Sequence, residues 1–496
     1  MLLQEVLERI PGVRWNGRGD ILIGGIAYDS RLVRAGDLFV AIRGEKEDGA
    51  RFIGEALSRG AAAVASEAPS APLPGEARIV VEDARAFLAD VARVWYGDPC
   101  ASLRLAAVTG TKGKTTCTYL LYSILRGAGL RSCLAGTIGM KIGDEEFPAK
   151  HTTPEAPDLY RFFRRAVDLG CTHGTLEVSS HALAQKRVYG ARFAVGVFMN
   201  LTHDHLDFHR TMDAYFEAKM ILFTPGNRNR LETAVINIDD TWGRKLAAAA
   251  GAGVLTFGFD RAADIRVLDF QSGFEGTRLR LGTPAGEARL RSPLIGRPNA
   301  YNIMAATGAA LGLGLGLDDI GAGVAALAGV PGRMQRVEGG QDFLVLVDYA
   351  HSPDSLENVL RTARELPRRR LITVFGCGGD RDRAKRPVMG AIAAKWSDRV
   401  IATSDNPRTE DADSILREIE PGLEEGPAPF DVIPDRREAI AAAVAMARSG
   451  DIVVIAGKGH EDYQIIGTRT FPFDDREVAA QCLRNRPGTA PGEEAP

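Results

Sequence analysis

A glycine-rich loop between an apolar run and a helical segment is the feature that most constrains the fold. The apolar run Leu105–Val108 is followed by TGTKGKTT and then by CTYLLYSIL. Backbone N–H groups in such a strand-to-helix turn point at an anion, and the N-terminus of the helix adds partial positive charge. The spacing predicts a nucleotide triphosphate site, with Lys114 at the β- and γ-phosphates and the Thr115 hydroxyl on Mg²⁺.

This loop is shorter than the common phosphate-binding loop. The first glycine of the usual G-x-x-x-x-G-K-[ST] pattern would fall at Val108, so the motif here is G-T-x-G-K-T. A chance glycine-rich turn is the competing interpretation, and it is disfavoured because strand, loop and helix all fall where phosphate binding requires them. The loop residues expected to bind ATP are Gly110, Thr111, Lys112, Gly113, Lys114, Thr115 and Thr116.

The same succession of strand, turn and helix recurs along most of the chain. Apolar runs such as Leu176–Val178 and Val195–Phe198 alternate with helical patterns, which predicts βαβ units around a largely parallel sheet. Alternating runs between residues 265 and 290 predict an antiparallel insertion. At about 150 residues per domain, 496 residues suggest three domains. We expect α/β units over 1–84, 85–335 and 336–496, with a disordered tail from about residue 486.

Charge and composition exclude several classes of protein. The 61 Lys and Arg residues against 64 Asp and Glu give a net charge of −3, which argues against a generic nucleic-acid binder. No window approaches the roughly 18 apolar residues of a membrane span. The start, MLLQEVLERI, carries Glu5, Glu8 and Arg9, so we expect no signal peptide. Six scattered cysteines without a CxxC pair indicate a reduced, cytoplasmic protein.

Six of the eight histidines lie between His151 and His209, and five of these six fall in three clusters: HTTPE, LEVSSHAL and NLTHDHLDFH. Each cluster is expected to follow the carboxyl end of a strand, where ligands bind in open α/β sheets. Glu177 ends such a strand, and its carboxylate suits Mg²⁺. The residues His203, His205, Asp207 and His209 are close to the pattern of binuclear zinc hydrolases, but Phe208 stands where that pattern needs a histidine. Solvated loop histidines are the other interpretation.

The motifs together carry a family resemblance. In order, GTKGKTT, HTTPE, EVSSHAL, NLTHDHLDFH with a following AK, GRPNAYN, PGRMQ, DYAHSP and AGKGHEDYQ resemble the Mur ligases of peptidoglycan synthesis, from about Ser30 to about Glu477. The resemblance implies a UDP-binding domain over 1–84, an ATPase over 85–335 and a Rossmann-like amino-acid-binding domain over 336–496. It also implies ATP-dependent amide formation through an acyl phosphate, with Mg²⁺. The loop alone is shared with folylpolyglutamate-type ligases, which remain an alternative.

The resemblance also implies roles for individual residues. Lys114, His205 and Lys219 are the expected catalytic residues, and Lys219 matches the family's carbamylated lysine, although alone it would be read as a solvated surface lysine. The expected metal site comprises Thr115, Glu177, His205 and the Lys219 carbamate. Further ATP contacts are implied for Asn299, Asn302, Arg333, Asp348 and His351. UDP-sugar contacts are implied for Ser30, Thr152, Thr153, Ser179, Gln185 and Arg187.

The segment DNPRT at 405–409 bears on the incoming amino acid. It resembles the motif of family members that add meso-diaminopimelate to UDP-MurNAc-L-Ala-D-Glu, whereas lysine-adding members lack this arginine. Diaminopimelate has a distal carboxylate that lysine lacks, and a planar guanidinium such as that of Arg408 suits it. A solvated arginine in an Asn-Pro turn and ligation of L-lysine are the alternatives. The other residues implied for this site are Arg381, Asp405, Asn406, Pro407, Gly457 and Glu461.

The expected partners are therefore small molecules, UDP-MurNAc-L-Ala-D-Glu and meso-diaminopimelate, with no nucleic acid and no membrane span. We expect a cytoplasmic monomer whose product serves cell-wall synthesis, and through it cell shape and division. A competing hypothesis from another class is a phosphate-loop protein that hydrolyses ATP only to switch between states or to bind partners. Such a protein would release phosphate without any UDP-linked acceptor.

Overall fold

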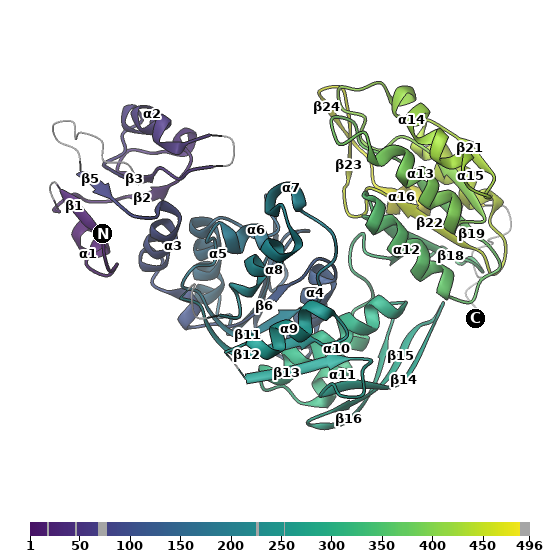
Figure 1. Ribbon diagram of the computed structural model, residues 1–496, viewed down its shortest axis with the longest axis horizontal. Coiled ribbons are helices and arrows are strands. Elements are labelled where there is room, and N and C mark those ends of the chain that lie inside the picture. The colour runs from purple at the N-terminus through teal and green to yellow at the C-terminus, as the bar shows by residue number, and fades with distance from the viewer. Residues whose placement is uncertain (17–18, 45–46, 68–76, 225–227, 252, 487–496) are drawn as a thin grey trace, which may run out of the picture. The chain divides into compact units, whose positions relative to one another are not determined.

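The computed structural model describes residues 1–16, 19–44, 47–67, 77–224, 228–251 and 253–486 (Figure 1). The chain divides into two compact units. Unit 1 comprises Met1–Arg266, Gly282–Gly286 and Ile303–Gly323, and unit 2 comprises Val267–Leu281, Glu287–Asn302 and Val324–Pro496. The predicted tail lies outside the described residues from 487 onward.

Unit 1 begins with a five-stranded sheet in the order β1-β5-β4-β3-β2. The last four are parallel neighbours, and β1 closes the edge antiparallel to β5. Alternate residues of β3 enter different cores, because Leu38 and Val40 pack on one face and Phe39 on the other. The elements are α1 (Leu3–Leu7), β1 (Arg14–Asn16), β2 (Gly25–Ala27), β3 (Asp37–Val40), α2 (Ile53–Ser58), β4 (Ala63–Ser66), β5 (Ala77–Val80) and α3 (Ala84–Trp95), with 3₁₀ turns at Ser30–Leu32 and Gly49–Phe52.

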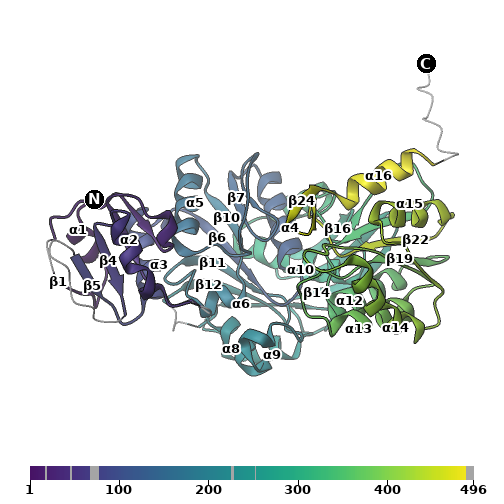
Figure 2. The same cartoon turned by 90° about the horizontal axis from the view of Figure 1, so that it is seen from above.

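An eleven-stranded sheet, most of whose strands belong to unit 1, carries the glycine-rich loop. Strands β13, β12, β11, β6, β10 and β7 are parallel neighbours in that order, and Figure 2 shows β12, β11, β6 and β10 side by side. The strands are β6 (Arg104–Thr109), β7 (Ser132–Ala135), β8 (Met140–Ile142), β9 (Glu145–Phe147), β10 (His173–Glu177), β11 (Arg192–Phe198), β12 (Arg230–Asn237), β13 (Gly253–Gly258), β14 (Ile265–Gly273), β15 (Gly276–Thr283) and β16 (Gly286–Ser292). The predicted parallel sheet is therefore confirmed, and its inner strands are buried on both faces, as parallel strands require.

Helices accompany these strands in the expected alternation. They are α4 (Lys114–Gly127), α5 (Ala156–Asp168), α6 (Ser180–Ala184), α7 (Leu206–His209), α8 (Met212–Met220), α9 (Thr241–Ala249), α10 (Arg297–Gly312) and α11 (Leu317–Ala326), with a 3₁₀ turn at Pro99–Ala101. The phosphate-loop helix α4 meets α11 closely, because Ser123 Oγ donates to the Gly323 carbonyl at 2.7 Å and a Cβ at Gly323 would collide with the Ile124 backbone.

Several strands of this sheet lie outside the sequence prediction. The β8–β9 hairpin pairs antiparallel beside β7 at the sheet edge, where Glu145 and Glu146 are exposed and the apolar alternation is weak. This hairpin also changes the setting of one histidine cluster. Residues 151–155 follow the antiparallel edge strand β9 and precede α5, so they do not follow the carboxyl end of a parallel strand as expected. The other two clusters follow β10 and β11 as predicted.

Unit 2 contains a six-stranded sheet in the order β17-β18-β22-β19-β20-β21, parallel except for β17. Its strands are β17 (Gln335–Arg336), β18 (Leu344–Asp348), β19 (Leu371–Phe375), β20 (Arg399–Ala402), β21 (Phe430–Val432) and β22 (Ile452–Ala456), and a hairpin of β23 (Tyr463–Ile466) and β24 (Arg469–Pro472) follows. The helices are α12 (Pro353–Glu365), α13 (Lys385–Trp396), α14 (Ala412–Glu424), α15 (Arg436–Met446) and α16 (Asp475–Arg484).

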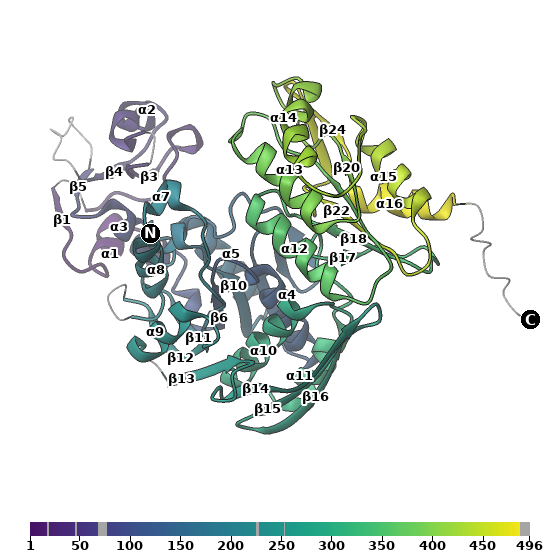
Figure 3. The same cartoon turned by 45° about the vertical axis from the view of Figure 1, so that its right-hand side comes forward.

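The unit 2 sheet is covered by helices on both faces. Leu356, Met389 and Ile415, from α12, α13 and α14, join one core, and Ile440 and Val478, from α15 and α16, join the other. Figure 3 shows these two groups of helices on opposite sides of the strands. This doubly wound arrangement places ligands at the carboxyl ends of the strands. Among the helices of the described residues, none is long and apolar enough to cross a membrane.

A fully buried ion pair joins two of these helices. Arg436 begins α15 and Asp475 begins α16, and neither side chain is exposed to solvent. Their guanidinium and carboxylate make two bonds of 2.7 Å, and Arg436 also donates to the Ala456 carbonyl at the end of β22. Removing one member of such a pair leaves an uncompensated buried charge.

Asp475→Asn should therefore lower the free energy of unfolding by about 3–5 kcal/mol, measured by urea denaturation of the full chain. Arg417→Ala is the matched control in the same unit, because Arg417 and its partner Asp411 are both 65% exposed. That control should change the free energy of unfolding by no more than about 0.5 kcal/mol. Equal effects of the two substitutions would contradict the structural role given to the buried pair.

Candidate active site

The glycine-rich loop connects β6 to α4, as the sequence predicts. Gly110 and Gly113 have φ values of 149° and 89°, conformations that glycine adopts without steric cost. Asn200, just after β11, holds the loop in place. Its Oδ1 accepts from the Lys112 backbone N–H at 2.9 Å, and its Nδ2 donates to the Lys112 carbonyl at 3.1 Å. The loop and the first turn of α4 contain all the predicted phosphate-binding residues: Gly110, Thr111, Lys112, Gly113, Lys114, Thr115 and Thr116.

Two lysines meet at a single carbonyl of this loop. Lys114 Nζ donates to the carbonyl oxygens of Gly110 and Thr111, both at 3.0 Å, and Lys219 Nζ donates to the Gly110 carbonyl at 2.9 Å. Lys219 is 1% exposed and lies 4.6 Å from the centre of the Tyr215 ring. The interpretation of Lys219 as a solvated surface lysine is therefore wrong, because α8 turns the side chain inward toward the loop.

Burial and a neighbouring charge both affect the pKa of Lys219. Its desolvated position lowers the pKa well below the ordinary value, and the positive charge of Lys114 lowers the pKa further. This shift favours the neutral amine, which is the nucleophilic form of a lysine.

Glu177, the last residue of β10, connects the loop to a neighbouring strand. Its Oε2 accepts from the Thr115 hydroxyl at 3.0 Å and from the Thr137 hydroxyl at 3.1 Å, and its Oε1 accepts from the Thr137 backbone N–H at 2.9 Å. The Thr137 hydroxyl also lies 3.1 Å from the hydroxyl of Thr152. Glu177 is fully buried, so its carboxylate is stabilised by these donors rather than by water. Thr137 is a functional neighbour that the sequence reasoning did not identify.

The histidine-rich segment forms a cluster of rings beside the loop. The His181 ring centre lies 4.9 Å from that of His205 and 5.4 Å from that of His209. His209 is buried, shares a 2.9 Å hydrogen bond with Ser180 and stacks on Tyr215 at 4.9 Å. Burial, followed by the nearby His181, lowers the pKa of His209 to about 4. His205 lies 5.9 Å from the Tyr215 ring, so Tyr215 links it to Lys219.

A zinc site does not assemble from the predicted ligands in this segment. His203 and Asp207 are exposed, whereas His209 is buried against Tyr215. Over the ranges that the structure describes, no three His, Cys, Asp or Glu side chains converge to hold a metal ion without other donors. The hydroxyl of Thr115 and the carboxylate of Glu177, 3.0 Å apart at the phosphate loop, are instead the hard oxygen donors that suit Mg²⁺ together with substrate phosphates.

The residues predicted to hold the UDP-sugar and its peptide mostly come together. Thr153 Oγ1 donates to the Glu177 carbonyl at 2.8 Å and accepts from the Ser179 N–H at 3.0 Å. Arg187 donates to the Thr153 carbonyl at 2.8 Å and to Gln185 Oε1 at 2.7 Å. Thr152 reaches the same group through Thr137. Ser30 is placed elsewhere in unit 1, where its hydroxyl donates to Glu55 at 2.7 Å in the 3₁₀ turn after β2.

The remaining predicted nucleotide contacts lie in unit 2, in two groups. At the start of α10, Asn302 Nδ2 donates to Asn299 Oδ1 at 2.9 Å, and both side chains are buried. Asp348 ends β18 and accepts from the Met334 N–H at 2.7 Å. Around the adjacent Tyr349, the Arg333 guanidinium lies 5.2 Å and the His351 ring 4.6 Å from the centre of the Tyr349 ring.

Arg408 lies in the loop after β20, facing the loop after β19. Its φ of 54° is a left-handed conformation that a non-glycine residue adopts only when its surroundings hold it. The backbone supplies that restraint, because the Arg408 N–H donates to the Ile465 carbonyl at 3.1 Å and its carbonyl accepts from the Gly467 N–H at 2.7 Å. The guanidinium Nη1 donates to the Gly379 carbonyl at 2.7 Å. Arg408 is therefore fixed in position by both its backbone and its side chain.

The other predicted amino-acid contacts surround this loop. Arg381 and Arg408 flank Gly378, and the Pro407 carbonyl packs so closely on Gly379 that a side chain there would collide. A Cβ at Gly457 would lie 2.5 Å from Asp405 Oδ2, which brings the loop after β22 against DNPR. The residues predicted to bind the amino acid thus lie together at the carboxyl ends of β19, β20 and β22. They are Arg381, Asp405, Asn406, Pro407, Arg408, Gly457 and Glu461.

A buried arginine holds two of these loops together and was not predicted. Arg386 is fully buried in α13 and binds both oxygens of Glu410, at 2.8 and 2.9 Å. Glu410 Oε1 in turn accepts from the Asp380 N–H at 2.6 Å. Arg386 lowers the pKa of Glu410 to about 2, so the carboxylate stays charged and keeps both bonds. The loops that carry Arg381 and Arg408 are therefore joined by an ionic contact beneath them.

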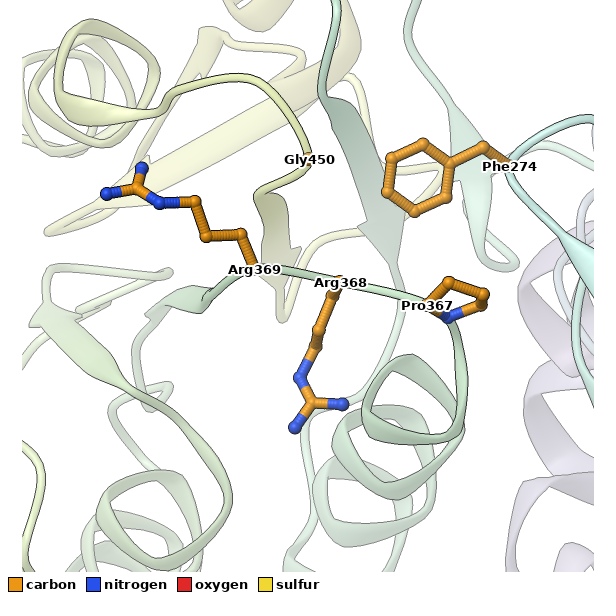
Figure 4. A pocket seen from close by; sticks show the side chains of 5 residues that line it. All are labelled: Phe274, Pro367, Arg368, Arg369 and Gly450. Atoms are coloured by element: carbon orange, nitrogen blue, oxygen red, sulfur yellow. The ribbon is translucent and has the colours of Figure 1, made fainter.

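An open pocket of about 390 Å³ lies at the other end of this sheet, lined by Phe274, Pro367, Arg368, Arg369 and Gly450. Figure 4 shows the guanidinium groups of Arg368 and Arg369 pointing in different directions and away from the Phe274 ring. The pocket adjoins the amino ends of β19 and β22, which begin at Leu371 and Ile452. Without convergent polar groups, and at the edge of the sheet opposite the DNPR loop, it is a weaker candidate for a ligand site.

Comparison with known proteins accounts for this arrangement. Residues 22–96 match the catalytic domain of the Mur ligase family, 108–310 its middle domain and 332–459 its glutamate ligase domain. The chain is 46% identical over 503 residues to a UDP-N-acetylmuramoyl-L-alanyl-D-glutamate--2,6-diaminopimelate ligase of Geobacter metallireducens, covering 98% of both chains. It is 47% identical to the protein of that name from Gloeobacter violaceus, covering 98% of this chain and 99% of the relative.

The solved structures agree with the sequence matches. A structure of a UDP-N-acetylmuramoyl-L-alanyl-D-glutamate--2,6-diaminopimelate ligase superposes with a TM-score of 0.72 at 36% identity, covering 97% of this chain and 98% of that one. The α/β fold with three family domains, expected from the motifs, is therefore confirmed. The chain belongs to the Mur ligase family.

Proposed function

We propose that the chain is an ATP-dependent amide ligase that joins meso-2,6-diaminopimelate to UDP-N-acetylmuramoyl-L-alanyl-D-glutamate in the synthesis of peptidoglycan precursors. The observation that carries the choice of amino acid is Arg408, fixed by its backbone and by the Gly379 carbonyl at the carboxyl end of the unit 2 sheet. The relatives of 46% and 47% identity, whose names give this reaction, support the same choice.

Two alternatives are less well supported. Ligation of L-lysine would leave the guanidinium of Arg408 without the distal carboxylate that it suits. A folylpolyglutamate-type ligase shares the phosphate loop, but the match to Mur ligases includes the N-terminal segment 22–96. The DNPR sequence at 405–408 also argues against the second alternative.

The nucleotide site follows from the loop. The backbone N–H groups of 110–116 and the start of α4 favour the phosphates of ATP, and Lys114 adds positive charge beside them. The Thr115 hydroxyl and the Glu177 carboxylate are the residues that would hold Mg²⁺, which would supply neutralisation of charge on the transferred phosphoryl group. The unit 2 residues proposed to complete ATP binding are Asn299, Asn302, Arg333, Asp348 and His351.

The reaction requires activation of a carboxylate. A carboxylate is a poor electrophile, so its oxygen first attacks the γ-phosphate, the bond to the β-phosphate oxygen breaks, and an acyl phosphate and ADP result. The neutral amine of the amino acid then attacks the acyl carbon, loses a proton, and phosphate leaves. There is little covalent chemistry for the protein to perform, so its contribution is positioning and neutralisation of charge. Arg187, which donates to the Thr153 carbonyl, is proposed to orient the acceptor's peptide.

Lys219 is proposed to act as a carbamate. The neutral amine adds CO₂ and releases a proton, which converts a potential cation into an anion. Because Lys219 Nζ and Lys114 Nζ share the Gly110 carbonyl, that anion would lie beside the Lys114 ammonium and remove the repulsion between the two lysines. A carbamate oxygen and the His205 imidazole are also suitable metal ligands.

The wider setting is proposed on the same basis. The acceptor is held by Ser30, Thr152, Thr153, Ser179, Gln185 and Arg187. The domains correspond to 1–84, 85–335 and 336–496, and we propose that the enzyme works as a cytoplasmic monomer.

The direct test measures phosphate release with ATP and Mg²⁺ while each substrate is added singly and together. Release should depend strictly on the presence of both UDP-MurNAc-L-Ala-D-Glu and meso-diaminopimelate, because the acyl phosphate requires the first and its turnover requires the second. Mass spectrometry of the product should show one new amide bond. ATP hydrolysis at the full rate without either substrate would instead indicate a switch protein.

Lys219→Ala should lose most ligase activity, by about 100-fold or more, as expected when a group that organises transferred phosphoryl charge is removed. Added formate or acetate should restore part of the rate by supplying a carboxylate in the space of the carbamate. Turnover is measured at saturating substrates, and Lys245→Ala, which removes an exposed lysine near Trp242, is the control. Wild-type turnover in Lys219→Ala would rule out the carbamate.

Arg408→Ala should raise the KM for meso-diaminopimelate by at least about tenfold, because a charge-assisted bidentate contact contributes roughly 1.5–3 kcal/mol. The KM for ATP should change little. Arg417→Ala, an exposed arginine on α14, is the matched control and should leave both constants unchanged. An unchanged KM for meso-diaminopimelate in Arg408→Ala would refute the assignment of this arginine.

A further inference from the structure

Lys458 is a fully buried cation at the centre of the proposed amino-acid site. It lies in the turn that follows β22, and its side chain has no exposed surface. Nζ donates to Asn406 Oδ1 at 3.1 Å and to Glu461 Oε2 at 3.2 Å, and lies 5.4 Å from the centre of the Tyr463 ring. An ammonium is costly to bury unless it is paired and hydrogen-bonded, so these two contacts hold the side chain in place.

We infer that Lys458 is a positioning residue that, directly and through Asn406, orients Glu461 to receive an ammonium group of the incoming amino acid. The inference rests on the proposed function, and it adds a residue whose side chain acts through its neighbours. Lys458 is enclosed by the loops after β20 and β22, and both of its contacts are to residues proposed to touch the substrate.

The first part of the argument concerns the amide of Asn406. Its Oδ1 accepts from Lys458 Nζ at 3.1 Å and from the Ile465 N–H at 3.0 Å. Both of these groups are donors only, so the amide cannot reverse without placing its own N–H₂ against them. Nδ2 is consequently directed at Glu461 Oε2, where it donates at 2.9 Å. Lys458 therefore fixes the orientation of the Asn406 amide, with Oδ1 toward the lysine and Nδ2 toward Glu461.

The second part concerns the carboxylate of Glu461. Its Oε2 accepts from both Asn406 Nδ2 and Lys458 Nζ, and the side chain is 16% exposed. Within the part of the chain that the structure describes, Oε1 accepts no hydrogen bond, so it is the oxygen available to a ligand. A carboxylate oxygen at a fixed position suits a primary ammonium, and diaminopimelate carries two such groups.

The test is the substitution Lys458→Met, which keeps the length of the side chain and removes its charge and its N–H donors. The KM for meso-diaminopimelate should rise by about tenfold or more, because two charge-assisted contacts that orient the site are lost. The KM for ATP and the turnover at saturating amino acid should change by less than about threefold, because the phosphate site is untouched. Thermal unfolding establishes that the variant is folded, and Lys458→Gln, which retains an N–H donor, replaces it if Lys458→Met does not fold.

Arg370→Met is the matched control for a purely structural effect. Arg370 pairs with the fully buried Asp451 at 2.7 Å, at the beginning of β22 rather than at its end. Its removal should lower the melting temperature and leave the KM for meso-diaminopimelate unchanged. If both variants raise this KM equally, Lys458 acts only through stability and the inference fails.

A double-mutant cycle separates positioning from simple electrostatics. If Lys458 acts through Glu461, then adding Lys458→Met to Glu461→Gln should raise the KM by less than about twofold over Glu461→Gln alone. Fully additive effects would overturn the inference. A lower KM in Lys458→Met would also overturn it, because the lysine would then compete with the substrate ammonium for Glu461. Wild-type enzyme that does not use meso-diaminopimelate would refute the proposed function itself, which distinguishes the two failures.

Discussion

The meeting of two lysines at one carbonyl oxygen is the contact on which the phosphate site depends. Lys114 and Lys219 reach the Gly110 carbonyl from α4 and α8, and two ammonium groups this close repel each other. Burial and the charge of Lys114 lower the pKa of Lys219, which shifts that side chain toward the neutral amine. The neutral amine is also the form that reacts with CO₂. Repulsion between the two lysines thus favours the form of Lys219 that the proposed modification requires.

The loop that these lysines contact is held mainly by residues from neighbouring strands. Asn200 follows β11 and binds both the backbone N–H and the carbonyl of Lys112. Glu177 ends β10 and binds the Thr115 hydroxyl. Because β6, β10 and β11 are parallel neighbours, their carboxyl ends place these groups around the start of α4 without long connections. Sheet order therefore determines which side chains reach the phosphates.

The fold class, the parallel sheets and most strands could be predicted from the sequence, because inner strands such as Leu105–Val108 are continuous apolar runs bounded by turn residues. The short edge hairpin of β8 and β9 was not predicted, because its charged residues leave little alternation of apolar and polar side chains. The sequence motifs also identified most of the residues that lie around Glu177 and Arg408. Thr137 and Asn200 were not identified, because a threonine and an asparagine in loops have no signal of their own until the sheet order brings them to the phosphate loop.

Buried arginines and the buried Lys458 were not identified for a related reason. In the sequence, Arg386, Arg436 and Lys458 are three cations among 61, and nothing in their spacing marks them as buried. The two buried arginines depend on acids far along the chain. Arg436 meets Asp475 across 39 residues, and Arg386 meets Glu410 across 24. Only the packing of the unit 2 helices and loops makes these pairs possible.

Lys219 and Lys458 show how the same side chain is used in opposite ways. Both are almost without solvent exposure, but Lys219 has a carbonyl and a second lysine as neighbours, whereas Lys458 has the carboxylate of Glu461. A buried lysine beside another cation is driven toward the neutral amine, and that makes it a reactive group. A buried lysine beside a carboxylate forms an ion pair that fixes the carboxylate in position. The role of a buried lysine in this chain therefore depends on its local partner. That partner determines whether the lysine is reactive or orients the residues that bind the substrate.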